Sequence, residues 1–469
     1  LLRPLARGLG RRPARAVVLS AVAFLRKCDP LSCRSRRRRS RSRGRGVHST
    51  SLFDGCGACV GSVRPGRQTV GVTRLELPAA SRRAVEAFVS EHLGHLVDGA
   101  GAGSRSIRGG QRAADAALHD FDVTGYASHR NEVHPHERRG ASRLSPYIRH
   151  GLLTLAEVWD AVAGGPARDV TKFRDELMWQ EYARHWYARL GRGTRRPTRA
   201  RPTVAEAGDE WDRTLPCLDA VVTELEHDGW LVNQTRMWLA SDWTVRHGQD
   251  WRRGEDRFFR HLLDGSRAAN RLGWQWTTGV GSAKPYGFSR RQVERRAPGW
   301  CASCPHRDAC PIEDWPEGPP TVPVEPPPEV DLTGPDRIER TGEPDTVWLT
   351  AESLGHSDPA LVAHPGLPAA FVFDEPLLAR LRLDGKRLVF LAETIAELAE
   401  ARPVEIFLGD PLVELAGRSL AVTHAPVPGF ATRAAALAPV ETHPWPWLRA
   451  PRAGSVRSFS AWRKLVDRS

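Results

Sequence analysis

Residues 316–345 (PEGPPTVPVEPPPEVDLTGPDRIERTGEPD) divide the chain into two parts whose apolar residues follow different patterns. This stretch is rich in proline and acidic residues, a composition typical of a semi-rigid, extended linker. Before it, over residues 76–315, apolar residues recur three and four positions apart, as in AEVWDAVA and KFRDELMWQEYARHWYARL, which predicts helices. We therefore expect a mostly α-helical domain, then a linker, then a second domain of another class.

The part after the linker, residues 346–469, alternates short apolar runs with helix-like segments. The runs are TVWLTA, AAFVFD, KRLVFLAE, VEIFLGD and SLAVTH, and the helix-like segments include EPLLARLRL and ETIAELAEA. Strands that alternate with helices predict a parallel sheet, here in a Rossmann-like α/β domain with a C-terminal tail. Because no G-x-G-x-x-G follows a strand in this part, we do not expect a tight dinucleotide site there.

The net charge of +13 lies almost entirely at the start of the chain, where residues 1–50 contain fifteen Arg or Lys and one acid, Asp29. Such a stretch cannot bury enough apolar surface to fold, so we predict a disordered, Arg-rich extension over residues 1–75. Such an extension would bind the phosphates of nucleic acid without sequence specificity. The alternative is an upstream sequence that is wrongly assigned to the protein. Residues 16–25 loosely resemble a signal peptide but lack an A-x-A-like cleavage site, so a cytoplasmic location is expected. No run of eighteen apolar residues occurs, which predicts no membrane span.

Three stretches of the helical part together resemble the FAD-binding domain of photolyases and cryptochromes. They are ASRLSPYIRHGLL (141–153), DELMWQEY (175–182), and NQTRMWLASDW through DGSRAANRLGWQW (233–276), with SAKPY following at 282–286. The resemblance implies a deoxyribodipyrimidine photolyase, a carbon–carbon lyase in which light-excited reduced FAD donates an electron to a pyrimidine dimer flipped out of UV-damaged DNA. The dimer would be a cyclobutane dimer or a (6-4) photoproduct. We expect a monomer without membrane partners.

Two other functions remain open. One is a cryptochrome-like blue-light photoreceptor without repair activity, and the other is a light-independent flavin and iron–sulfur electron carrier. Gln180 stands where photolyases often carry an arginine, and Ser266 replaces a second aspartate of the family motif, so both departures leave signalling possible.

The C-terminal part resembles the antenna-type domain that family members carry at their N-terminus. The resemblance rests on VWLTAESLGHSDPAL followed by FVFDEPLL. A circular permutation would explain the changed order, since domain termini are commonly close and exposed. The alternative is an unrelated nucleotide-binding-like appendage, and the antenna chromophore stays unassigned.

The resemblance also implies which residues hold the flavin. By this comparison, Arg236 forms an ion pair with Asp264 near the flavin ring, where a cation favours a reduced, anionic flavin. Asn270 faces flavin N5. Without the resemblance, the pattern S-x-x-S-P at residues 142–146 would indicate only a helix cap before Pro146. The expected contacts to the phosphates and the rest of the cofactor are Tyr126, Ser142, Arg143, Leu144, Ser145 and Phe173.

A lesion pocket is implied beside the flavin. Glu176 would hydrogen-bond the damaged bases and Trp179 would stack on them; with Gln180 they share one helix face. Without the resemblance, this pair is an exposed charge beside a core aromatic. The other expected pocket residues are Asn233, Met237 and Trp276, and the arginines expected at the pocket mouth are Arg138, Arg139, Arg143 and Arg149.

Electron-transfer and metal sites complete the prediction. Trp251 and Trp274 resemble the inner members of the family's tryptophan chain, although sixteen tryptophans also make core pairs inevitable. A third member is not evident. Four thiolates suit a [4Fe-4S] cluster or zinc, and the resemblance to iron–sulfur bacterial members favours the cluster. The four cysteines are Cys217, Cys301, Cys304 and Cys310.

Overall fold

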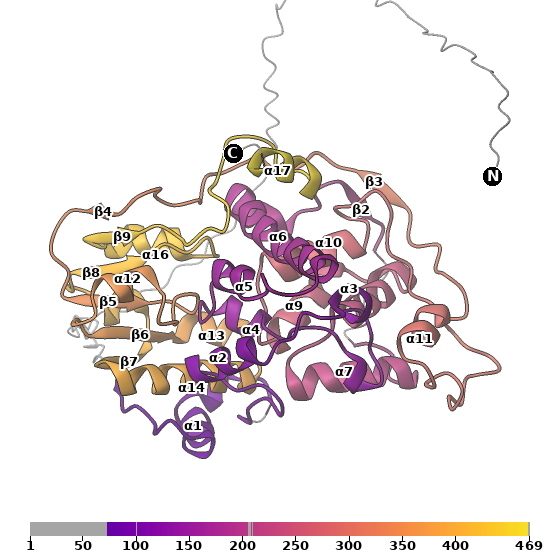
Figure 1. The fold of residues 1–469 in the computed structure, drawn as a ribbon, viewed down its shortest axis with the longest axis horizontal. Coiled ribbons are helices and arrows are strands. Elements are labelled where there is room, and N and C mark those ends of the chain that lie inside the picture. Colours follow the sequence, from indigo (N-terminus) through magenta and orange to yellow (C-terminus); the bar gives the residue numbers. More distant parts are fainter. Residues whose placement is uncertain (1–72, 100, 205–207, 209, 468–469) are drawn as a thin grey trace, which may run out of the picture. The chain divides into compact units, whose positions relative to one another are not determined.

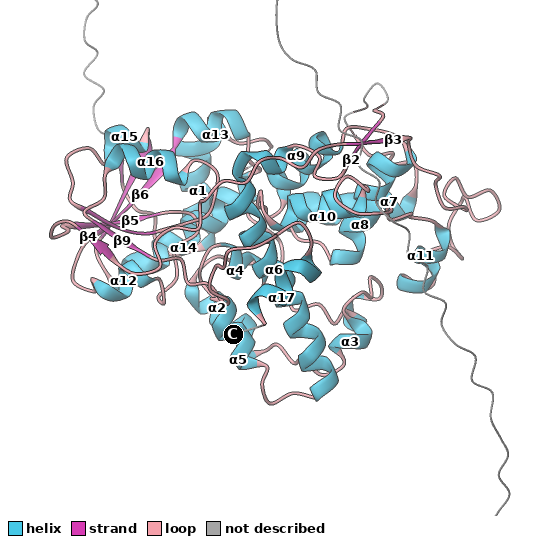
Figure 2. Cartoon of the chain, turned by 90° about the horizontal axis from the view of Figure 1, so that it is seen from above, coloured by secondary structure: helices cyan, strands magenta, loops and turns pink. Residues whose placement is uncertain are grey.

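The computed structural model describes residues 73–99, 101–204, 208 and 210–467 (Figure 1). Thr69–Ser469 forms one compact unit. Along the chain a helical part comes first and an α/β part follows; in Figure 2 the labelled strands of the larger sheet gather at the left, and a separate pair of strands lies at the right among the helices. A multidomain arrangement with high helical content and a mainly parallel sheet agrees with the sequence prediction.

The helical part is built around α6 (Ala167–Leu190), whose twelve buried side chains make it the central helix of this part. It ends at Gly191, where φ is 49°, a left-handed conformation that favours glycine. In two places a helix continues into a π-helical segment, at Val89–Leu93 and at Ser241–Arg246. The other helices are α1 (Arg82–Phe88), α2 (Gln111–His119), α3 (Tyr126–His129), α4 (Ser145–Arg149), α5 (Leu155–Ala161), α7 (Pro216–Asp228), α8 (Asn233–Ala240), α9 (Trp251–His261), α10 (Ala269–Thr277) and α11 (Arg290–Arg296).

The α/β part contains a seven-stranded sheet of order β1-β7-β6-β5-β8-β9-β4. The five inner strands are parallel, and the edge strands β1 and β4 pair antiparallel with their neighbours. From β5 the chain moves outward through β6 to β7, then returns to β8 on the other side of β5 and ends the parallel strands at β9. The strands are β1 (Arg74–Leu75), β4 (Glu339–Arg340), β5 (Thr346–Leu349), β6 (Ala369–Asp374), β7 (Val404–Gly409), β8 (Leu420–Thr423) and β9 (Glu441–His443).

Helices follow the strands of this sheet, as the alternating pattern predicts. Asp374, Asp384 and Asp410 each cap the helix that follows with a side-chain acceptor, which ends the preceding segment and starts the helix. The helices are α12 (Pro359–Ala363), α13 (Glu375–Leu381), α14 (Gly385–Ala401), α15 (Pro411–Glu414), α16 (Phe430–Leu437) and, in the tail, α17 (Phe459–Val466).

One predicted strand is wrong. The run KRLVFLAE forms the first half of α14, and the helix-like ETIAELAEA forms its second half. Thirteen of the seventeen residues of α14 are buried, so its sequence shows an unbroken apolar run in place of an amphipathic stripe. Such a run does not distinguish a buried strand from a buried helix, and the N-cap Asp384 was the signal for the helix.

The proline-rich stretch contributes strands at two places. β3 (Thr321–Pro323) pairs antiparallel with β2 (Ala200–Pro202) in the helical part, and β4 pairs with β9 in the sheet. The Arg-rich extension predicted over residues 1–75 lies outside the described residues except for its last three. Two of those form β1, which pairs with β7, so the prediction of disorder is wrong for them.

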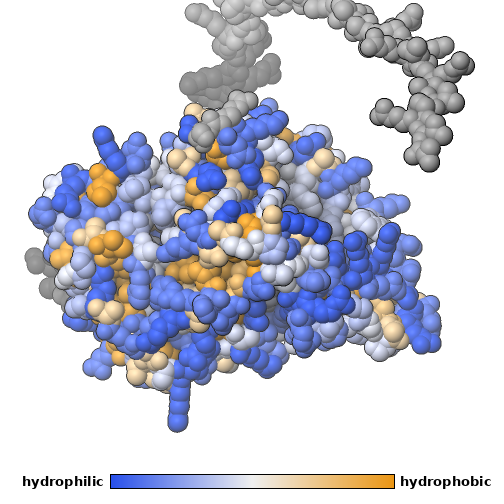
Figure 3. Space-filling view, viewed as in Figure 1, coloured by the Kyte–Doolittle hydropathy of each residue, from blue (hydrophilic) through white to orange (hydrophobic). Residues whose placement is uncertain are grey.

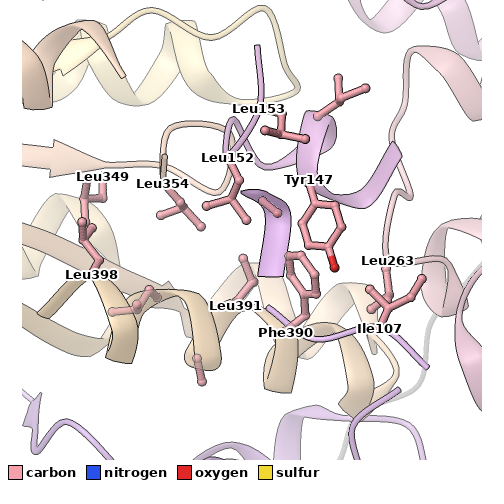
Figure 4. Close-up of a cluster of buried hydrophobic side chains, with 14 of the residues drawn as sticks. Ile107, Tyr147, Leu152, Leu153, Leu263, Leu349, Leu354, Phe390, Leu391 and Leu398 are labelled. Carbon is pink, nitrogen blue, oxygen red and sulfur yellow. The ribbon is translucent and has the colours of Figure 1, made fainter. Parts of the chain in front are cut away.

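One hydrophobic core joins the two parts of the chain. Figure 4 shows Phe390 and Leu391 of α14 facing Tyr147 and Leu152 of the helical part. The ring of Phe390 lies 6.0 Å from that of Tyr147 and 4.8 Å from that of His150. Full burial of such a side chain contributes about 1.5–3 kcal/mol, so this contact fixes α14 against α4.

The loops beside this core also meet closely. A Cβ added to Gly355 would lie 2.0 Å from the carbonyl oxygen of Gly151, so only glycine fits there. On the face drawn in Figure 3, hydrophilic side chains predominate and hydrophobic ones gather near the middle. Among the described residues, none of the helices has the length and apolar character needed to cross a bilayer.

Candidate functional site

The expected ion pair between Arg236 and Asp264 is present. Arg236 lies on α8 and donates from Nη1 and Nη2 to the two carboxylate oxygens of Asp264, at 3.1 and 2.8 Å. Its Nε donates to the carbonyl of Leu231 at 2.9 Å, so three hydrogen bonds orient the guanidinium. Only 17% of the Arg236 side chain and 7% of that of Asp264 is exposed. The pair therefore presents a fixed cation in a mostly buried place.

Asn270 lies near the start of α10 and is buried. Its Oδ1 accepts the backbone N–H of Ser266 at 2.5 Å, and Ser266 Oγ accepts the backbone N–H of Ala269 at 3.0 Å. Ser266 thus stabilises the start of α10. Because its oxygen is engaged, the Asn270 amide offers its NH₂ group as a donor.

Arginines converge on Gly265, the residue between Asp264 and Ser266. Arg149 Nε and Arg387 Nη2 both donate to the Gly265 carbonyl, at 3.1 and 3.2 Å. Arg387 comes from α14, and its burial, with Arg149 nearby, lowers its pKa to about 9. Arg267 and Arg387 also lie over the ring of Phe259, at 3.8 and 4.8 Å from its centroid.

Sequence reasoning missed Arg387 because it lies in the other part of the chain. Arg149 pairs with Glu352, Arg236 with Asp264, and Arg267 with Glu255 and Asp256, whereas Arg387 makes no ion pair among the described residues. A dianionic group such as a pyrophosphate matches such a set of guanidinium donors. The donor set therefore fits FAD.

The segment 142–145 leads into α4. Arg143 has a φ of 59°, and its guanidinium lies 5.1 Å from the centroid of Trp230. Ser145 Oγ accepts the indole N–H of Trp230 at 3.1 Å, and Ser142 Oγ accepts the backbone N–H of Leu144 at 3.4 Å. Leu144 is fully buried, so it anchors the segment while Arg143 stays exposed.

Tyr126, Phe173 and Glu176 form a second group on α3 and α6. The Tyr126 ring meets Phe173 edge to face at 4.9 Å. Burial, with the Glu176 carboxylate as a smaller cause, raises the pKa of Tyr126 well above its usual range. Glu176 pairs with Lys172 at 2.7 Å and with Arg130 at 3.3 Å. These two cations orient its half-buried carboxylate, which can accept hydrogen bonds.

Trp179 contacts the C-terminal helix. Its ring stacks on Phe459 of α17, with centroids 4.0 Å apart and planes 9° apart, and it meets Tyr182 edge to face at 5.9 Å. Trp276 is 45% exposed and its ring lies 6.5 Å from that of Tyr286. The two tryptophans expected in one pocket therefore have different neighbours.

The remaining expected lesion and DNA residues differ in exposure. On α8, Asn233 is exposed and Met237 is half-buried. Arg139 pairs bidentately with Glu224, at 2.5 and 3.1 Å, while Arg138 is exposed. With Arg149 bound to Glu352, two of the four arginines expected at a pocket mouth are held inside the chain.

A series of buried aromatic rings runs from Trp274 to Trp243. Trp274 meets Phe258 edge to face at 5.1 Å, Phe258 lies 5.8 Å from Trp211, and Trp211 lies 4.9 Å from Trp243. Trp251 is buried in the same core. Sequence reasoning gave no role to Trp211 or to Trp243, the last residue of NQTRMWLASDW, because only the fold brings Trp211 to Phe258 and Trp243 to Trp211.

The four cysteines gather where α7 begins and where the chain follows α11. They are free thiols. Burial, together with the nearby thiols of Cys301, Cys310 and Cys304, raises the pKa of Cys217 to about 12. His306 of the loop contacts the carbonyl of Thr214 at 3.2 Å, which ties the loop to the start of α7. The four thiols therefore lie near enough to influence one another, and thiolates are ligands that zinc and iron–sulfur clusters take.

Comparisons with known proteins point to one family. The family described as "FAD binding domain of DNA photolyase" matches residues 173–294. The chain is 30% identical over 196 residues to the deoxyribodipyrimidine photo-lyase of Synechococcus sp., covering 38% of this chain and 40% of that protein. It is 33% identical over 192 residues to a deoxyribodipyrimidine photo-lyase of Thermus thermophilus, covering 38% and 44%.

Two solved structures also match. A bacterial class III photolyase from Agrobacterium tumefaciens gives a TM-score of 0.35 at 28% identity, over 40% of this chain and 42% of that chain. An archaeal photolyase from Sulfolobus tokodaii gives 0.33 at 21%, over 46% and 54%. The chain spans less than half the length of the curated relatives it matches. Within that span, the resemblance to the FAD-binding domain of DNA photolyases, predicted from the sequence motifs, is confirmed over residues 173–294.

Proposed function

We propose that this protein is a deoxyribodipyrimidine photolyase that repairs UV-damaged DNA with light. The observation that carries the proposal is the fixed cation of Arg236, paired with Asp264, together with the oriented Asn270 amide, all within the region that matches the photolyase FAD-binding domain. Each of the three residues was expected at a flavin from its motif. Their joint placement supports that role.

FAD would lie against residues from several helices. The guanidinium groups of Arg236, Arg149 and Arg387 would neutralise its charge, and the Asn270 NH₂ would donate to its ring. When bound, the flavin supplies light absorption and the exchange of an electron. The other proposed contacts are Tyr126, Ser142, Arg143, Leu144, Ser145 and Phe173.

The DNA lesion would bind beside the same helices. Enzymes that act on bases within DNA, photolyases among them, take the target nucleotide out of the stack. Glu176, oriented by Lys172 and Arg130, would accept a hydrogen bond from the extruded bases, and Trp179 would offer the ring face that Phe459 leaves free. The other proposed lesion contacts are Asn233, Met237 and Trp276.

Electrons would reach the flavin through buried tryptophans. Trp274 and Trp251 are the proposed inner members of the route. The ring contacts from Trp274 through Phe258 to Trp211 support an outward continuation.

The four cysteines would hold a [4Fe-4S] cluster, with zinc as the alternative. Their mutual influence on the Cys217 pKa supports a common site. Iron and acid-labile sulfide in the protein purified under anaerobic conditions would favour the cluster, and one equivalent of zinc without sulfide would favour the alternative.

The α/β part would be a Rossmann-like domain over residues 346–469, equivalent to the antenna-type domain but moved by circular permutation. Counted from β5, the parallel strands follow the order 3-2-1-4-5, which supports a doubly wound fold. A cleft lined by Glu352, Asp358, Thr423 and Trp445 lies where this order reverses between β5 and β8. Ligands of such sheets bind at this place, but this cleft has a volume of only about 20 Å³, too small for a chromophore, so the antenna chromophore stays unassigned.

The test is anaerobic blue-light repair of dimer-containing oligonucleotides, with the absorption spectrum of the same sample recorded before and after. Glu176→Gln should lose most of the repair and keep the flavin. Glu400→Gln is the matched control, because Glu400 also pairs with an arginine at the surface, Arg112 at 2.7 Å. Unchanged repair in Glu176→Gln would remove Glu176 from the mechanism.

A blue-light photoreceptor is the second candidate. It is favoured by the stacking of Phe459 on Trp179, which covers one face of a proposed lesion contact. Light-driven reduction of bound flavin without loss of dimers would select this function. Absence of any photoreduction would reject both.

A further inference from the structure

Three side chains of the α/β part meet at one point, away from the residues assigned above. His364 Nε2 and His443 Nε2 both contact the same carboxylate oxygen, Glu441 Oε1, at 2.7 and 2.5 Å. All three ligand-type atoms lie within 4.8 Å of one another. The side chains of Glu441, His443 and His364 are 0, 3 and 14% exposed.

The backbone explains why these residues meet. Glu441 and His443 are two positions apart on β9, so their side chains leave the same face of the strand. His364 is the C-cap of α12, where the chain turns back toward β6, and this brings its ring to that face. The two imidazole rings stand nearly perpendicular, at 87°, with centroids 6.2 Å apart.

A fourth residue fixes the carboxylate from its other side. Arg340 of β4 is the direct register partner of Glu441, and its Nε lies 2.6 Å from Glu441 Oε2. Directly opposite residues of an antiparallel pair share a face, which explains the contact. Because the cation occupies Oε2, Oε1 is left to the two histidines. Partners of this kind orient the ligands of metal sites.

We propose that His364, Glu441 and His443 form a binding site for a divalent transition metal, for which Zn²⁺ is the best match. Two imidazole nitrogens and one carboxylate oxygen are ligands that zinc takes in proteins, with water in the fourth position. Each imidazole binds the ion through Nε2 as a neutral ring with its proton on Nδ1. The ion would join α12 to β9 and, through Arg340, hold the edge strand β4.

The test compares zinc uptake by the full-length protein and by single variants. Zinc is measured after equilibration with Zn²⁺ and removal of the unbound ion, and thermal melting is recorded with and without Zn²⁺. His364→Gln should bind one equivalent less than the unsubstituted protein and lose the zinc-dependent rise in melting temperature. Zinc held by the cysteines is common to all variants, so it does not affect this difference.

His424→Gln is the matched control, since His424 is a buried histidine of the same sheet that contacts the carbonyl of Leu332. It should bind as much zinc as the unsubstituted protein. Glu441→Gln, which keeps the size of the side chain, is the second variant and should show the same loss of zinc. It serves as the test if the His364→Gln protein does not fold. Equal zinc uptake in Glu441→Gln and the unsubstituted protein would overturn the proposal.

Discussion

The indole ring of Trp179 stacks on the phenyl ring of Phe459, with the two planes only 9° from parallel. One residue comes from the central helix α6 and the other from α17 near the end of the chain, and Arg463 of α17 also pairs with Asp175 of α6 at 3.3 Å. The C-terminal helix therefore covers one face of the tryptophan that is proposed to stack on a lesion. A base can then use only the opposite face, or it must displace Phe459.

Phe459→Ala should expose Trp179 and weaken the docking of α17. Loss of a stacked, half-buried ring should lower the free energy of unfolding by about 2 kcal/mol. Tryptophan fluorescence should shift to longer wavelength, and binding of dimer-containing oligonucleotides should tighten if Phe459 competes with the lesion. Arg457→Ala, an exposed change before α17, is the control. Weaker dimer binding in Phe459→Ala would contradict the competition.

Asp358 gives the α/β part a pH dependence of stability. The carboxyl is buried, and burial raises its pKa from 3.8 to about 6, although Thr423 and the N–H groups of Ala360 and Leu361 donate to it. Since the folded pKa lies above the unfolded one, this group's contribution is fully present below pH 3.8 and is lost as pH rises through about 6.

Asp358→Asn should therefore stabilise the protein at pH 8 by up to about 3 kcal/mol, because the substitution removes the buried charge. The amide oxygen of the asparagine can still accept the hydrogen bonds that Asp358 accepts. Urea unfolding between pH 5 and 8 measures this, and the decline attributable to Asp358 should disappear in the variant. Asp331→Asn is the control, since hydrogen bonds from Thr333 lower the pKa of Asp331. An unchanged decline in Asp358→Asn would refute the assignment.

The sequence predicted the features that depend on neighbours along the chain. Helical spacing identified α6, and alternation identified β5 to β8. The Arg236–Asp264 ion pair followed from a family motif. α14 was misread in part because a helix buried on all sides loses the 3.6-residue pattern that marks an exposed one.

Features that depend on distant segments were not predicted. Arg387 contacts Gly265, and Phe459 contacts Trp179, only because α14 and α17 pack against the helical part. The two-residue strand β1 is too short to carry a period-2 pattern, so nothing in its sequence marks it as a partner of β7. The packing of distant segments decides such contacts, and the composition of the sequence does not reveal that packing.

Arg236→Lys should weaken flavin binding. Lysine keeps the charge but cannot make the bidentate contact to Asp264, so the cation loses its fixed position. The Kd for FAD should rise about tenfold, corresponding to about 1.4 kcal/mol. Arg213→Lys, which alters an exposed arginine paired with Asp219 and Glu226, should leave the Kd unchanged. Equal affinities in the two variants would mean that Arg236 does not contact the flavin.

Trp211→Phe should slow the light-driven reduction of bound flavin several-fold. Trp211 contacts Phe258, which contacts Trp274, and it also contacts Trp243, so it joins these buried rings to the cleft that Trp211 and Trp243 line. Phenylalanine keeps an aromatic ring in the core but is much harder to oxidise than tryptophan. The measurement is the rate of flavin bleaching under blue light with an external thiol reductant. Trp315→Phe, which changes a tryptophan that is 57% exposed, is the control. If both variants photoreduce at the unsubstituted rate, electrons enter by a path that bypasses Trp211, and Trp251 becomes the residue to substitute next.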